Sequence, residues 1–168
     1  MVQAVRNYRN GSITIEDGNA RQLLIPVDVG ELSFTEKEEA GVVDSRGAPN
    51  QFVQGKSESI PISFKAHFTE YFSKDRAGVG VDDVSIRDFL KGNYTGSASV
   101  TNCGPHAVKL IFNISSPCKV GVGDKDEVIT FPTFHADEFS FSEGEDMNEL
   151  NISGKNLEPV PTFVRNVV

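Results

Sequence analysis

The residues best suited to chemistry in this sequence are three histidines and two cysteines. Histidine nitrogens and cysteine thiolates hold zinc where they recur at short spacings such as Cys-x-x-Cys. Here His67, His106 and His135 lie far apart, and Cys103 and Cys118 flank one predicted strand. The ends of a straight strand of that length are too distant for a disulfide bond within one subunit. We expect two free thiols, with a disulfide to a neighbouring subunit as the alternative, and we expect no metal and no cofactor.

Three glycine-rich or acidic stretches invite a ligand-binding interpretation. GVGVDD (78–83) and GVGDKDE (121–127) look like fragments of phosphate-binding loops, but neither completes G-x-G-x-x-G, and Asp stands where phosphate would approach. EGEDMNE (143–149) gathers carboxylates without the spacing of an EF-hand loop. There is no G-x-S-x-G sequence, and neither cysteine has an identifiable partner histidine. We interpret all three stretches as turns, with weak calcium binding at the last as the alternative, and we expect no enzymatic activity.

The composition limits the class of protein. The chain has 168 residues, 38% of them hydrophobic, which suits one domain with a substantial core. Its 24 acidic and 16 basic residues give a net charge of −8 with no cluster of bases, so tight binding to phosphates is not expected. An acidic wall that DNA slides past is compatible with this charge, because it repels phosphate. The opening MVQAVRNYRNGS lacks the apolar stretch of a secretory signal, so we expect folding in a cytoplasm and no membrane span.

Alternation of apolar and polar residues with a period of two dominates the chain and predicts strands with one buried face. The longest series is SIPISFKAHFT, and ADEFSFSEGEDMNELNISG reads as a hairpin around an acidic turn. We predict a mainly β fold, an antiparallel β-sandwich or barrel. The inward positions would be Ile13, Ile15, Leu23, Ile25, Ile60, Ile62, Phe64, Ala66, Phe68, Val108, Leu110, Phe112, Ile114, Phe139, Phe141, Leu150 and Ile152.

Two strands change face partway along their length. In LLIPVDVGELSF the phase slips at Gly30, and in TFPTFHADEFSFS Phe134 is out of phase with Phe139, so a second irregularity is predicted near Asp137. Bends of this kind let one strand serve two sheets of a sandwich or a closed barrel.

One short α-helix is predicted within VDDVSIRDFLKGN. Its apolar stripe would comprise Ile86, Phe89 and Leu90. Gly92 can end it. The candidates for the N-terminal cap are Asp82, Asp83 and Ser85.

Three segments do not fit a compact monomer, although residues 1–168 read as one domain. They are an N-terminal arm (1–10), a long inter-strand loop without sustained periodicity (36–58) and a C-terminal arm (159–168). Loops of that length are usually functional or disordered. Because all three carry apolar residues, we predict extensive self-assembly through them. The alternative is that each packs back on its own domain.

The order of several motifs resembles the tail tube (major tail) proteins of tailed bacteriophages. GSITIEDG resembles their opening strand. GELSFTEKEEAGVVDSRGAPNQFVQGKSESIPISFKAHF resembles their second strand, long loop and third strand, with DSRG similar to the Asp-Arg-Gly of that loop apart from Ser45. EVITFPTFHADEFSFSEGEDMNELNISGKNLEPVP resembles their closing strands. Together these stretches span most of the chain.

The resemblance implies a β-sandwich with one helix, six copies of which form a ring, and rings that stack into a hollow tube. The long loop would bridge stacked rings and the arms would contact neighbouring subunits. DNA would pass through an acidic lumen without tight binding. The protein would belong to the virion tail after assembly in the host cytoplasm. Its further partners would be the tape measure protein, the tail terminator and the baseplate or tip proteins.

Transferred to this chain, the resemblance names candidate residues for each surface. The ring-stacking candidates are Val42, Val43, Asp44, Arg46 and Phe52, and the arm-contact candidates are Phe163 and Val164. If the closing hairpin lines the channel, the lumen candidates are Glu138, Ser140, Glu149 and Asn151.

Two other functions are compatible with the same fold class. The related tube protein of type VI secretion has a similar sandwich and helix but a protein-conducting lumen. A monomeric sandwich that binds carbohydrate or protein would show aromatic residues clustered on loops. Here the loop aromatics are few, namely Phe52 and Tyr71, and Trp is absent.

Overall fold

The structure is a computed structural model, and it describes residues 11–26, 32–37, 40–43, 51–54, 58–67, 84–114, 126–142, 149–158 and 161–165. Antiparallel strands make up most of this part, and its helix is short. The predicted mainly β, sandwich-like fold is confirmed. The strands are β1 (Gly11–Glu16), β2 (Gln22–Pro26), β3 (Ser33–Phe34), β4 (Ala40–Val43), β5 (Gln51–Gln54), β6 (Ile60–His67), β7 (Val108–Ile114), β8 (Glu127–Ser142), β9 (Glu149–Asn156) and β10 (Thr162–Arg165).

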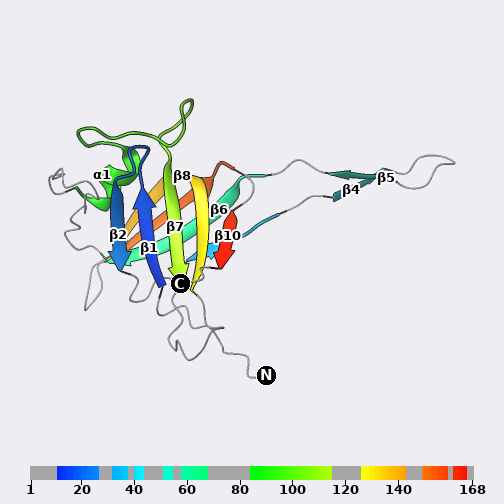
Figure 1. The fold of residues 1–168 in the computed structure, drawn as a ribbon, viewed down its shortest axis with the longest axis horizontal. Helices are drawn as coiled ribbons and strands as arrows, with labels where there is room; N and C mark the ends of the chain where they lie inside the picture. The colour runs from blue at the N-terminus through cyan, green and yellow to red at the C-terminus, as the bar shows by residue number, and fades with distance from the viewer. Residues whose placement is uncertain are drawn as a thin grey trace, which may run out of the picture.

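Strand β8 belongs to both layers of the sandwich. Its first half pairs with β7 and β10, and its second half pairs with β9. One layer therefore has the order β2-β1-β7-β8-β10 and the other the order β8-β9-β6-β3. In Figure 1 the strands of the first layer stand side by side, and β6 crosses obliquely behind them.

The passage of β8 from one layer to the other depends on a register shift. Against β9 the register slips between Ala136 and Glu138, which confirms the irregularity predicted near Asp137. Gly154 of β9 lies opposite Ala136, and a Cβ atom on Gly154 would lie 2.1 Å from the carbonyl oxygen of His135. Only glycine allows the two backbones to approach so closely here.

The inward positions predicted from the alternation form the core between the layers. Strands β1 and β7 alternate strictly between buried and partly buried residues, so each turns one face inward. Phe139 is only partly buried, and Phe141 is 59% exposed although Leu150, opposite it on β9, is fully buried, so the inward prediction is wrong for Phe141. Phe68 and Gly30 lie outside the described residues. The fully buried large side chains are Phe64, Phe89, Phe112, Phe131, Phe134, Ile13, Ile15, Leu23, Ile25, Ile60, Ile62 and Ile86.

Helix α1 (Ile86–Lys91) packs against β8 and is capped at both ends. Ser85, one of the predicted caps, accepts a hydrogen bond from the Asp88 backbone N–H at 3.1 Å. Gly92 closes the helix in the left-handed conformation, with φ of 71°, as predicted. The Lys91 ammonium group donates to the carbonyl oxygen of Ala136 at 2.7 Å, which ties the helix to the bend of β8. The described helix is too short to cross a membrane.

The long loop predicted at 36–58 contains a regular element. Strands β4 and β5 pair antiparallel as a separate two-stranded sheet, with Val42 opposite Phe52 and Gly41 opposite Val53. In Figure 1 this hairpin projects far from the sandwich. A two-stranded hairpin standing alone is only marginally stable in water.

Candidate assembly surfaces

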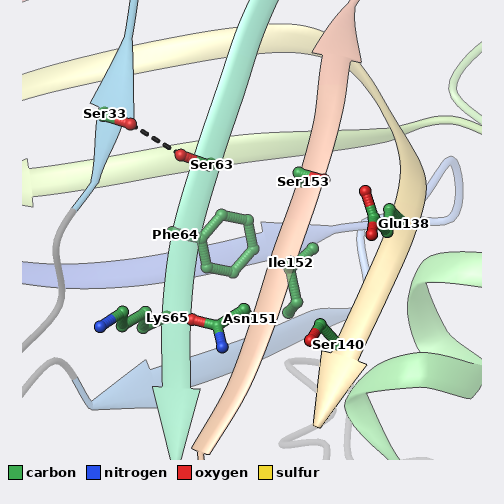
Figure 2. Close-up of a pocket in the computed structure, with 9 residues that line it drawn as sticks. All are labelled: Ser33, Ser63, Phe64, Lys65, Glu138, Ser140, Asn151, Ile152 and Ser153. Atoms are coloured by element: carbon green, nitrogen blue, oxygen red, sulfur yellow. Dashed lines mark hydrogen bonds between the residues drawn. The ribbon is translucent and has the colours of Figure 1, made fainter. Parts of the chain in front are cut away.

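The four lumen candidates lie on one face of one layer. Glu138 and Ser140 project from β8, and Glu149 and Asn151 from the adjacent β9, with Ser140 directly opposite Asn151. On β6, which pairs with β9, Lys65 lies opposite Asn151. A continuous polar surface therefore crosses the outer side of the β8-β9-β6-β3 layer. This surface is hereafter called the serine face, and Figure 2 shows the part of it that includes Glu138, Ser140, Asn151 and Lys65.

The serine face is shallow and rich in hydroxyl groups. A groove of about 290 Å³ crosses it, with Phe64 and Ile152 beneath and hydroxyl, amide and charged groups around them. Ser33 and Ser63 share a hydrogen bond of 2.7 Å between their hydroxyl oxygens, which holds the short strand β3 to β6. The remaining polar lining residues are Lys65, Glu138, Ser140, Asn151 and Ser153.

The charges on the serine face are few and nearly balanced. Glu138 and Glu149 supply negative charge, and Lys65 and Lys155 supply positive charge on the same outward positions. Lys65 lies 3.9 Å from Glu149, and both side chains are about 40% exposed (42% and 40%), so this ion pair contributes little to stability. Among the described residues the face carries no basic cluster that would hold phosphates.

The ring-stacking candidates divide between described and undescribed residues. The backbones of Val42, Val43 and Phe52 lie in the β4–β5 hairpin, which brings Val42 and Phe52 directly opposite each other. Asp44 and Arg46 fall outside the described residues. Their role at a stacking contact stays a prediction.

The arm-contact candidates lie on a strand. Phe163 and Val164 belong to β10, which pairs with the first half of β8 at the edge of the layer. Their side chains remain 52% and 50% exposed, and the centroid of the Phe163 ring lies 6.4 Å from that of the Phe34 ring. Pro161, just before the strand, is buried, and an edge position is where proline is tolerated. The N-terminal arm (1–10) lies outside the described residues.

Two histidines that are distant in sequence meet beside the bend of β8. His135 Nδ1 lies 2.6 Å from the backbone oxygen of His106, and His135 Nε2 lies 3.6 Å from Asp137. The His106 ring packs against Gly92, where an added Cβ would lie 2.7 Å from it. Among the described residues no group of three His, Cys, Asp or Glu side chains converges as a metal site. Cys103 is exposed and not disulfide-bonded, and Cys118 lies outside the described residues.

Burial lowers the pKa of His106 below the ordinary value of 6.5. A hydrogen bond with the Phe89 backbone and the charge of Asp17 oppose this effect, while nearby His135 adds to it. The Nε2 atom of His106 is buried and has no hydrogen-bond partner in the described structure, so a proton there would be poorly accommodated. Burial and the lack of a partner for Nε2 both favour the neutral form of His106 in the folded protein.

This lowered pKa predicts a pH dependence of stability. The stabilising contribution is complete above the unfolded-state pKa of about 6.5, and it is lost as the pH falls through the lower pKa of the folded state. We expect the free energy of unfolding, measured with urea, to fall between about pH 7.5 and about pH 5 more steeply in the natural protein than in His106→Gln. Equal pH dependence in the two proteins would contradict this assignment.

Leu24 is a surface residue that the alternation did not single out. It lies on the edge strand β2 with 53% of its side chain exposed, between the buried Leu23 and Ile25. The signal was present in the run LLI, where an apolar residue occupies an outward position. Phe163 and Val164 are exposed on β10, so both edges of this layer carry exposed apolar side chains.

Comparison with known proteins gives a likeness of fold. No protein-family model and no curated protein matches the sequence. Among solved structures, the chain is similar to a chain in the cryo-EM structure of the anti-feeding prophage (AFP) baseplate, 6-fold symmetrised, with a TM-score of 0.56 and 6% sequence identity. The likeness covers 100% of both chains. It shows that this chain shares the fold of a chain in that baseplate structure.

Proposed function

We propose that this protein is the structural subunit of a tail tube, in which six copies form a ring and the rings stack into a hollow conduit for DNA. The observation that carries the proposal is the fold shared over its whole length with a chain of a 6-fold symmetrised baseplate. A component of such a particle works by assembly, and the sandwich described here offers surfaces suited to assembly.

Three features of the chain support this proposal. The β4–β5 hairpin projects from the sandwich and suits a contact between rings. Two edge strands of one layer carry exposed apolar side chains, which suits contacts within a ring. The serine face has no basic cluster among its described residues, which suits a wall that DNA passes without binding.

In this proposal Glu138, Ser140, Glu149 and Asn151 line the lumen. The net charge of −8 on the chain adds long-range repulsion of phosphate to the weak local contacts of the serine face. The tape measure protein, the tail terminator and the baseplate or tip proteins are the further partners that we propose.

The proposal is tested by electron microscopy of the purified natural protein over a concentration series, with light scattering on a sizing column alongside. Hollow rings or tubes are the expected result. A protein-filled lumen in particles isolated from the natural host would instead favour a type VI-like tube. A monomer at every concentration, in the presence of a tube initiator as well, would contradict the proposal and favour a monomeric binding module.

Replacing residues 40–54, which span the β4–β5 hairpin, by a short Gly-Ser linker is expected to abolish stacking. The sandwich should remain folded, because the hairpin forms its own sheet apart from the core. The measurements are tube length by electron microscopy and the unfolding transition by circular dichroism.

Two point variants and one control sharpen this test. Val42→Asp and Phe52→Asp should each shorten the tubes, since the two residues lie opposite each other in the hairpin. Leu157→Asp, at an exposed apolar residue after β9, should leave the tubes unchanged. Loss of the folded sandwich on removing the hairpin would show that 40–54 is part of the core fold and not an interface.

A further inference from the structure

The layer β2-β1-β7-β8-β10 has two edges, and the strand at each edge pairs on one side only. Within the described residues β2 pairs with β1 and β10 pairs with β8, and neither has a second neighbour. A free edge presents unpaired backbone N–H and C=O groups that can accept another strand. Such edges are either protected from pairing or pair with a strand of another chain.

The two edge strands run in the same direction. Every neighbouring pair in the layer is antiparallel, so the direction reverses at each step and returns at the fifth strand. In Figure 1 the arrows of β2 and β10 point the same way at opposite sides of the layer. A rotation about an axis along the strands therefore brings β10 of one copy beside β2 of the next, and the two would pair in parallel.

The exposed apolar side chains of the two edges lie on the same surface of the layer. Leu24 lies opposite Thr14 of β1, whose outward side chain places Leu24 on the outer surface. Val164 lies opposite Val128 of β8, which is on the outer surface as well because the next residue, Ile129, is buried. Leu24 and Val164 of adjacent copies would then form an apolar cross-strand pair.

The inner side of the β10 edge is open to a partner too. Phe163 points inward beside Ile129 but stays 52% exposed, because no strand follows β10 within the described structure. A cleft of about 300 Å³ lies next to it, lined by apolar side chains that include Phe34 and Phe112, with Ser33 and Glu127 adding polar groups. A strand added at β10 would cover this opening between the two layers.

We propose that adjacent copies in the ring join β10 to β2 in a head-to-tail contact, centred on Val164 of one copy and Leu24 of the next. This inference rests on the proposed function and names its contact within the ring. A contact between two different surfaces produces closed rings when the rotation closes. A two-fold contact of β10 with β10 would leave Leu24 exposed, whereas the head-to-tail contact covers both apolar edges.

The test uses Leu24→Lys and Val164→Lys, two single substitutions of exposed residues, in the full chain. Each variant alone keeps one intact edge and should remain monomeric. An equimolar mixture should give a 1:1 dimer and nothing larger. The intact β10 edge of the first variant would bind the intact β2 edge of the second, while the two lysine-bearing edges repel. Light scattering on a sizing column measures these states, and circular dichroism confirms that each variant is folded.

Each result decides between head-to-tail pairing and another arrangement. Leu157→Lys, an equally conservative change at a residue on neither edge, should assemble like the natural protein. Rings from either edge variant alone, or a mixture that stays monomeric, would overturn the edge contact while leaving the tube proposal standing. A natural protein that never assembles would overturn both.

Discussion

Gly154→Ala is expected to destabilise the protein by about 3 kcal/mol or more, because the new methyl group would collide with backbone. The Cβ atom would lie 2.1 Å from the carbonyl oxygen of His135 and 2.9 Å from Cα of Ala136. Neither atom can move away as a flexible side chain would, so β8 and β9 would have to separate where β8 changes layers. Urea unfolding followed by circular dichroism measures the loss.

The neighbouring position provides a matched control. Ser153→Ala, one residue earlier on β9 and partly exposed on the serine face, should change the free energy of unfolding by less than about 0.5 kcal/mol. A second variant separates backbone from side-chain crowding. Phe134 Cε2 is also close to the added Cβ, at 2.8 Å, so Phe134→Leu should fail to rescue Gly154→Ala. If it does rescue, the crowding comes from the ring and not from the backbone.

Asp17→Ala should cost about 3 kcal/mol of folding free energy, because a buried carboxylate accepts several hydrogen bonds at the β1–β2 turn. Asp17 is 2% exposed and accepts from the backbone N–H groups of Asn19 and Arg21 at 2.9 and 2.8 Å. The Tyr94 hydroxyl donates to it at 2.5 Å, and the Tyr94 ring stacks on Phe89 of the helix with centroids 5.2 Å apart. The substitution would release the turn from the segment after α1.

The tyrosine offers a second readout of this substitution. Burial, together with the hydrogen bond and charge of Asp17, raises the pKa of Tyr94 above its ordinary value of 10. In Asp17→Ala this pKa should fall toward 10, as followed by ultraviolet absorbance during alkaline titration. Asp137→Ala removes an exposed carboxylate near His135 and should change stability by no more than about 0.5 kcal/mol. Equal losses from Asp17→Ala and Asp137→Ala would show that the buried network is not what stabilises the turn.

The parts of the fold that the sequence predicts are those where one face of a strand is buried. Strict alternation identified the inward residues of β1, β6 and β7, since a slip by one residue would expose the whole apolar set. The helix was predictable because its caps and stripe are local. The bend of β8 was predictable because the phase of its apolar residues changes at Asp137.

Short or solitary strands escaped this reasoning. Strands β4, β5 and β10 have four residues each, too few for a period to emerge. Contacts between distant residues escaped it as well, since nothing local links Asp17 to Tyr94 across 77 positions. The four lumen candidates were brought to one face by the register of the closing hairpin, which the alternation does specify. Leu24 and Val164 can be placed on opposite edges of one layer only when the order of the strands is known, and no local sequence pattern contains that order.

The long strand β8 makes the two layers one cooperative unit. Its backbone is hydrogen-bonded to β7 and β10 in one layer and to β9 in the other, so neither layer can open without disturbing the same strand. Partial unfolding through separation of the layers is thereby disfavoured, and local opening is confined to elements away from β8. Tension applied to one layer would therefore pass through the backbone of β8 directly into the other layer.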